Sequence, residues 1–118
     1  MRRTRYHEVL AAGRAPNTDD LGLDAAGIEH TRGWIKVNQY LETNVPGVYA
    51  LGDANGGPAF THISYHDFQI VYHNLFSPVK RSTAGRLVPY ALFTDPELGR
   101  VGMTEQEARA AGKNIRLG

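Results

Sequence analysis

The chain has 118 residues, enough for one small domain with a modest core. Its 13 Lys and Arg residues nearly balance its 12 Asp and Glu residues, which argues against binding to nucleic acid or to an anionic membrane surface. It has no cysteine, so it forms no disulfide, no thiolate metal site and no thiol redox centre of its own. Because it also lacks a membrane-length apolar run and a signal-peptide pattern, we expect a cytoplasmic protein.

Short strand patterns separated by turn-forming residues occupy the first half of the chain. Val, Ile, Tyr and Trp favour strands, whereas Gly, Pro and Asn end them. The cluster at 13–17 and the Pro46–Gly47 pair are such turns, and Thr18–Ile28 indicates a short connection that is rich in turns or weakly helical. The strands are expected at Tyr6–Ala12, Trp34–Val37 and Val48–Leu51.

One long helix is predicted next, over Pro58–Phe76, because apolar side chains recur there at intervals of three, four and five residues. Pro58 suits the first turn, where a missing N–H group costs no hydrogen bond. The composition then changes to small, polar and basic residues over Ser77–Arg86. This change indicates a linker or a domain boundary.

The last part of the chain predicts a strand, a turn, a second strand and a helix. Thr104, with Glu107 three residues later, forms a capping-box pattern, and Gly112 is a candidate helix C-cap. The strands are expected over Leu87–Thr94 and Arg100–Met103, joined by a turn at 95–99.

The stretch VYALGD, residues 48–53, places a glycine and a carboxylate where a strand ends and a helix follows. In an open α/β sheet, ligands bind beyond the carboxyl ends of the strands, at loops that lead into helix N-termini. Gly52 lets a ligand approach the backbone, Asp53 accepts hydrogen bonds from sugar hydroxyls, and the helix start favours an anion. An Asx-turn at Asp53 explains the same residues without a ligand, so spacing alone leaves both interpretations open.

Three segments of the chain carry a family resemblance. They are AAGRAPNTDDLGLDAAGI, WIKVNQYLETNVPGVYALGDANGGP and VPYALFTDPELGRVGMTEQEA. In this order they resemble the C-terminal half of the pyridine nucleotide-disulfide oxidoreductases, a family that includes dihydrolipoamide dehydrogenase, glutathione reductase and mercuric reductase. The resemblance implies an α/β fold class: a partial, Rossmann-like FAD/NAD(P)-binding domain followed by the start of an α+β dimerisation domain.

The resemblance also implies a division of the chain and a cofactor. Residues 1–20 match the end of an NAD(P)-binding domain, 21–80 the C-terminal segment of an FAD-binding domain, and 81–118 the start of an incomplete interface domain. The cofactors expected are FAD and, in the complete enzyme, NAD(P)H. Members of the family pair through the interface domain, so a homodimer is the expected assembly.

The resemblance assigns roles to individual residues. Gly13 matches the point at which the chain leaves the NAD(P)H-binding domain, and Asp53 matches the carboxylate that holds a ribityl hydroxyl of FAD. The four consecutive residues 59–62 match the helix start beneath the flavin pyrimidine ring. The expected cofactor-binding residues are therefore Gly13, Gly52, Asp53, Ala59, Phe60, Thr61 and His62.

The departures from the family pattern limit what the chain is expected to do alone. It contains no G-x-G-x-x-G motif and no redox-active cysteine pair, so we expect a fragment that lacks the N-terminal half of the enzyme. The isolated chain is predicted to be inactive, with no catalytic residue of its own. The alternative hypothesis is a non-catalytic dimerisation or interaction module that no longer binds FAD.

Several charged and ionisable residues have simpler explanations than a site. His62 and His66 have the i,i+4 spacing of a metal-binding pair, but no supporting ligand follows them, so no metal site is expected. Asp67 is interpreted as a surface charge or a charge that compensates the helix cap, and Arg86 as part of a solvated linker. Arg14 either reaches a nucleotide phosphate or lies in water.

Overall fold

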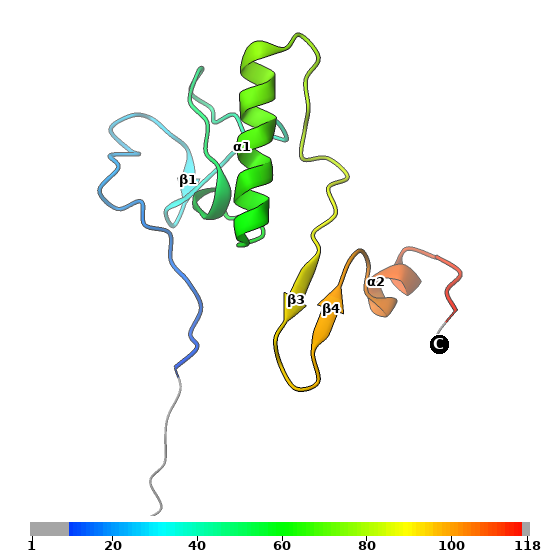
Figure 1. Ribbon diagram of the computed structural model, residues 1–118. Helices are drawn as coiled ribbons and strands as arrows, with labels where there is room; N and C mark the ends of the chain where they lie inside the picture. The colour runs from blue at the N-terminus through cyan, green and yellow to red at the C-terminus, as the bar shows by residue number, and fades with distance from the viewer. Residues whose placement is uncertain (1–9, 117–118) are drawn as a thin grey trace, which may run out of the picture.

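The computed structural model describes residues 10–116, and its ordered elements are short except for one helix (Figure 1). They are β1 (His30–Thr31), β2 (Trp34–Ile35), a 3-10 turn η1 (Gly52–Asn55), α1 (Thr61–Phe76), β3 (Tyr90–Leu92), β4 (Leu98–Arg100) and α2 (Glu105–Ala110). The strands form two antiparallel pairs, β1 with β2 and β3 with β4.

The first part of the chain builds a small core against α1. One buried cluster contains Leu23, Ile35 and Ala50, and a second contains Leu41, Ile70 and Val71. Val37 packs against both clusters and so connects the β1–β2 pair to the helix. The core therefore lies between the loops of residues 18–51 and one face of α1.

Helix α1 has 16 residues and begins at Thr61, three residues later than predicted. Pro58 lies outside the helix because Phe60, the N-cap residue, has an extended backbone. The helix ends at Phe76, as predicted. Its buried residues recur at intervals of one, three and four and include two polar side chains: Ile63, Asp67, Ile70, Val71 and Asn74.

From the end of α1 the chain runs back along the helix toward its N-terminal end (Figure 1). Asn74 binds both the N–H and the carbonyl group of Arg81, at 2.7 and 2.8 Å. Farther along, Arg86 forms an ion pair with Asp67 of α1, and the Tyr90 ring stacks on Phe60 at 5.7 Å. The predicted linker is thus an extended segment fixed to the helix, not a solvated tether.

The last part of the structure follows the predicted order of strand, turn, strand and helix. Strand β4 starts two residues earlier than predicted, because Leu92 pairs with Leu98 and the turn is correspondingly shorter. The capping box of α2 is confirmed: the Thr104 hydroxyl accepts a hydrogen bond from the Glu107 N–H group, and the Glu107 carboxylate accepts one from the Thr104 N–H group. Gly112 takes a left-handed conformation just after the helix, as expected near a C-cap.

Two of the predicted strands differ in the structure. At 48–51 only Tyr49 pairs, through a single bridge to Glu42, which two flanking backbone hydrogen bonds accompany: Thr43 N–H to the Val48 carbonyl and Ala50 N–H to the Leu41 carbonyl. The strand predicted over Tyr6–Ala12 falls largely outside the described residues, and positions 10–12 are not in a strand. Within 10–116, no helix is long and apolar enough to cross a membrane.

Candidate functional site

The site begins at η1, where the chain turns between the core and α1. Gly52 is buried with φ of +64°, a left-handed conformation that favours glycine. A Cβ atom at this position would lie 2.6 Å from Ser64 Oγ and 3.0 Å from Ser64 Cβ. Glycine is therefore required here both by backbone conformation and by the close approach of α1.

Asp53 follows in the same turn and keeps its carboxylate accessible. Its side chain is 42% exposed, and Oδ2 lies 2.9 Å from Arg14 Nη2. Among the described residues, no group donates a hydrogen bond to Asp53 Oδ1. Asp53 thus retains an acceptor for a hydroxyl group, while Arg14 places a positive charge beside it.

A pocket of about 380 Å³ brings most of the predicted site residues together. It lies at the junction of the turn and the start of the helix. Its lining consists of Arg14, Leu51, Gly52, Asp53, Ala59, Phe60, Thr61 and Ser64. Backbone and hydroxyl groups, one carboxylate and one guanidinium group thus share one concave surface.

The N-terminal end of α1 adds hydrogen-bond donors to this pocket. Ile63 and Ser64 both donate to the carbonyl group of Phe60, whereas the N–H groups of Thr61 and His62 have no partner within residues 10–116. The first turn contains no acidic residue and the N-cap side chain makes no capping bond. The partial positive charge of this helix end is therefore available to a ligand.

Two predicted site residues lie elsewhere. The His62 side chain faces a different hollow, which is lined by the β3–β4 pair, and its ring stacks on Phe60 at 5.3 Å. Gly13 does not line the pocket; its neighbour Arg14 does. Within the part of the chain that the structure describes, no group of three or more His, Asp or Glu side chains is arranged to hold a metal ion, so His62 and His66 gain no third ligand.

Asp67 is the site residue that the sequence interpretation missed. It is only 1% exposed, which contradicts its assignment as a surface charge. Its Oδ2 atom accepts hydrogen bonds from the Gly52 N–H group at 2.9 Å and from Asn55 Nδ2 at 3.2 Å, and its Oδ1 atom pairs with Arg86. The helical spacing contains the signal, because Asp67 is four residues after Ile63 and three before Ile70, on the apolar face.

Arg86 is likewise not a solvated linker residue. Its side chain is 13% exposed, and Nη1 also lies 3.5 Å from His66 Nδ1. An arginine is expected next to a buried carboxylate, because an unpaired charge is costly away from water. The interpretation failed because nothing in local sequence indicates which residues 19 positions apart will meet.

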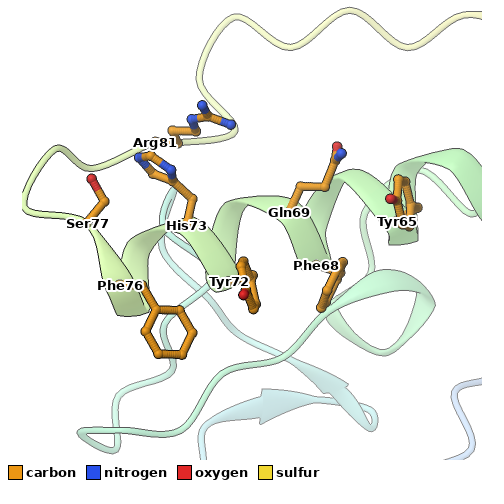
Figure 2. Close-up of a pocket in the computed structure, with 8 residues that line it drawn as sticks. All are labelled: Tyr65, Phe68, Gln69, Tyr72, His73, Phe76, Ser77 and Arg81. Carbon is orange, nitrogen blue, oxygen red and sulfur yellow. The ribbon is translucent and has the colours of Figure 1, made fainter.

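The face of α1 that points away from its buried residues presents a row of exposed aromatic rings (Figure 2). Tyr65, Phe68, Tyr72 and Phe76 succeed one another with ring centroids 5.9, 5.7 and 5.0 Å apart. In Figure 2, Phe68, Tyr72 and Phe76 project from one side of the helix, while His73 and Gln69 lie toward the other. This face lies away from the Gly52–Asp53 pocket and contributes none of its lining.

A second electrostatic cluster stabilises the last part of the chain. Arg100 bonds the Tyr90 hydroxyl at 3.3 Å and the Glu107 carboxylate at 2.8 Å. Hydrogen bonds from the Thr104 N–H and hydroxyl groups, and then the charge of Arg100, lower the pKa of Glu107. The bond to Tyr90 raises the pKa of Arg100. These groups cap α2 and join it to the strands.

Comparison with known protein families gives two matches that together cover most of the chain. Residues 7–67 match the model described as pyridine nucleotide-disulphide oxidoreductase. Residues 88–118 match the dimerisation domain of the same group of enzymes. The residues between the two matches include the segment that runs back along α1.

Individual relatives agree with these matches. A probable pyridine nucleotide-disulfide oxidoreductase, RclA, from Escherichia coli is 44% identical over 92% of this chain and 25% of its own length. Dihydrolipoyl dehydrogenase from Thermus scotoductus is 40% identical over 93% of this chain and 24% of its own length, and mercuric reductase from Staphylococcus aureus is 37% identical over 92% and 20%. The chain spans about a quarter of the length of these curated relatives.

A solved structure confirms the predicted α/β fold class. The HOCl-induced flavoprotein disulfide reductase RclA from Escherichia coli superposes with a TM-score of 0.82 at 44% identity, over 90% of this chain and 25% of that one.

Proposed function

This chain belongs to the pyridine nucleotide-disulphide oxidoreductase family, and on that premise we propose that it forms part of an FAD-dependent enzyme. The enzyme moves electrons from NAD(P)H through the flavin to a disulfide or another acceptor. The observation that carries the proposal is the pocket in which the Asp53 carboxylate and the N-terminal end of α1 meet. A cytoplasmic location stays a prediction from the sequence.

The residues of the pocket fit a flavin nucleotide by their chemistry. Asp53 has a free carboxylate oxygen for a ribityl hydroxyl, and the absence of a side chain at Gly52 keeps the turn close to α1. The unpartnered N–H groups of Thr61 and His62 supply donors and partial positive charge for the pyrimidine end of the ring system. FAD, when bound, accepts and passes on the electrons; the role of this chain is to hold and orient it.

We retain Gly13 and His62 in the proposed site with a smaller role. Gly13 lies one residue before Arg14, so its role in the site is to bring the backbone to the position from which Arg14 lines the pocket. His62 contributes its backbone N–H group, because its side chain faces the β3–β4 pair. Ala59, Phe60 and Thr61 shape the edge of the pocket below the expected ring.

We further propose the domain division at 1–20, 21–80 and 81–118, with homodimer formation through the last part. The dimerisation-domain match at 88–118 and the exposed apolar side chains there support this assignment. The side chains concerned are Leu92, Phe93, Leu98, Val101 and Met103.

The test of FAD binding is a chimera of Escherichia coli RclA in which residues 10–116 of this chain replace the matching segment. We expect the chimera to purify with FAD, and Asp53→Asn to weaken FAD binding by about 10- to 100-fold, because a charged hydrogen bond is worth about 1.5–3 kcal/mol. Fluorescence titration with FAD measures the affinity. Asp20→Asn, at an exposed residue away from the pocket, is the matched control.

Two results would contradict the proposal. A correctly folded chimera that cannot retain FAD would favour the interaction module over the flavin enzyme. Equal FAD affinity in the Asp53→Asn and Asp20→Asn chimeras would remove Asp53 from the site.

A further inference from the structure

Asp67 joins its own helix to two segments that are far from it in the sequence. It lies in the middle of α1, accepts hydrogen bonds from the Gly52–Asn55 turn, and pairs with Arg86 of the segment that follows the helix. The two carboxylate oxygens divide these tasks. Oδ2 binds the turn, whereas Oδ1 binds Arg86.

A buried carboxylate of this kind depends on all its partners. At 1% exposure Asp67 receives no compensation from water, so its charge must be balanced by hydrogen bonds and by Arg86. If Arg86 is removed, the carboxylate is left with two neutral donors. With too few partners for a buried charge, the carboxylate shifts its position, and the oxygen that holds Gly52 shifts with it.

The segment that carries Arg86 reaches Asp67 by a fixed path. Thr83 donates to the carbonyl group of Gln39 at 2.9 Å, and Asn74 binds the backbone of Arg81 at both of its polar groups. Val88, two residues beyond Arg86, is where the dimerisation-domain match begins. Arg86 thus lies just before that domain. It is also the residue of this segment that pairs with Asp67, and Asp67 in turn binds the Gly52–Asn55 turn.

We propose that Asp67 and Arg86 are positioning residues that hold the Gly52–Asn55 turn, and with it Asp53, in the geometry that binds FAD. Docking of the segment 81–86 against α1 then supports the flavin site through Asp67. This inference rests on the proposed FAD site. It adds to that proposal a link between the site and the segment that leads into the dimerisation domain.

The first experiment needs no cofactor. In the 118-residue chain, amide hydrogen exchange is measured at Gly52, whose N–H group binds Asp67, and at Ala50, whose N–H group binds Leu41 in the core. We expect Arg86→Gln to speed exchange at Gly52 by about tenfold or more, with a smaller change at Ala50. Arg81→Gln is the matched control, because that side chain forms no ion pair or hydrogen bond within the described residues.

Each outcome decides the matter. Exchange at Gly52 that is unchanged in Arg86→Gln, or equally changed in Arg81→Gln, overturns the proposal. If Arg86→Gln unfolds the chain, both amides exchange equally fast, and Arg86→Lys replaces it because lysine keeps the charge without the guanidinium fork. Selective loss of protection at Gly52 in Arg86→Lys supports positioning, whereas unchanged exchange at Gly52 or parallel changes at both amides overturn it.

The second experiment uses the chimera with Escherichia coli RclA. We expect Arg86→Gln to weaken FAD binding by about tenfold although Arg86 does not line the Asp53 pocket, and Arg81→Gln to leave it unchanged. A chimera that binds no FAD even without substitutions counts against the proposed function, while the exchange result at Gly52 still tests the positioning pair. Normal FAD affinity in the Arg86→Gln chimera overturns the link to the flavin site.

Discussion

The two ends of the structure differ in how they bury apolar surface. Residues 10–76, which we term the helix region, enclose two buried clusters around Ile35 and Ile70. Residues 87–116, which we term the hairpin region, contain one buried apolar residue among those described, Ala108. Most of its larger apolar side chains lie on the surface, and Phe93 is 92% exposed.

This difference indicates two sources of stability within one chain. The helix region is held by its own core and by the Asp67 network, so its folding is an intramolecular property. The hairpin region is held by local hydrogen bonds and by the capping box of α2, and its apolar surface is of the kind that another surface covers. Variants in the two regions should therefore change different measurements.

The largest expected effect is in the core of the helix region. Ile70→Ala removes a side chain that is 2% exposed and should lower the free energy of unfolding by about 2–5 kcal/mol, enough to unfold a marginal domain. Urea denaturation followed by circular dichroism measures the change. Phe93→Ala is the counterpart in the hairpin region. It should leave the free energy of unfolding nearly unchanged while reducing self-association in sedimentation experiments. Equal destabilisation by both variants would end the distinction between the regions.

A smaller effect is expected from the turn that carries Asp53. Gly52→Ala forces alanine into a left-handed conformation, at about 1–2 kcal/mol, and brings Cβ against Ser64. Gly47→Ala is the control, since Gly47 has φ of +80° but nothing within 4 Å of the added atom. The difference between the two unfolding free energies isolates the contact with α1. If both variants lose the same stability, the close approach of Ser64 has no energetic importance.

Loss of the α2 cap should affect the hairpin region alone. Thr104→Ala removes the hydroxyl that accepts from the Glu107 N–H group, at a cost of about 0.5–2 kcal/mol to the helix. Faster amide exchange at Ala108 and Ala111, whose N–H groups close the turns of α2, reports this loss. Exchange at Ala50 in the helix region should stay the same, and a matching change there would show that the two regions unfold together.

The smallest effect is a dependence on pH. Because the pKa of Glu107 is lowered in the folded chain, its stabilising contribution is complete above the unfolded value of 4.5 and is lost as the pH falls through the lowered folded value. Amide protection in α2, corrected for intrinsic exchange, should therefore decline below pH 4.5. Glu107→Gln should flatten this decline, whereas Glu105→Gln should leave it in place. A decline that persists in Glu107→Gln would assign the effect to another group.

The fold was predictable where local rules determine it. The end of α1 at Phe76 and the capping box at Thr104 follow from periodicity and from the preference of hydroxyl side chains for helix starts. The start of α1 was placed too early, because Pro58 is compatible with a first helical turn but does not require one. The strand predicted at 48–51 forms only a single bridge in the structure. A strand depends on pairing with other strands, and the local sequence does not show which strands lie beside it.

The site was predictable in part, for a related reason. Gly52 and Asp53 adjoin the helix start in sequence, so a single motif brings them to one pocket with Ala59, Phe60 and Thr61. Asp67 and Arg86 were misread because their roles arise from a contact between distant positions. A charged residue on the apolar face of a helix was the available signal, and it predicts burial more directly than it predicts the partner.

The path of residues 77–90 along α1 has a consequence for variation in length. Three contacts, of Arg81 with Asn74, of Arg86 with Asp67 and of Tyr90 with Phe60, fix this segment at successive points on the helix. Each residue added to an extended chain lengthens it by about 3.3 Å, which exceeds the length of a hydrogen bond. Insertions or deletions between 81 and 86 should therefore be tolerated far less well than in the turn at 95–97, although both stretches lack regular secondary structure.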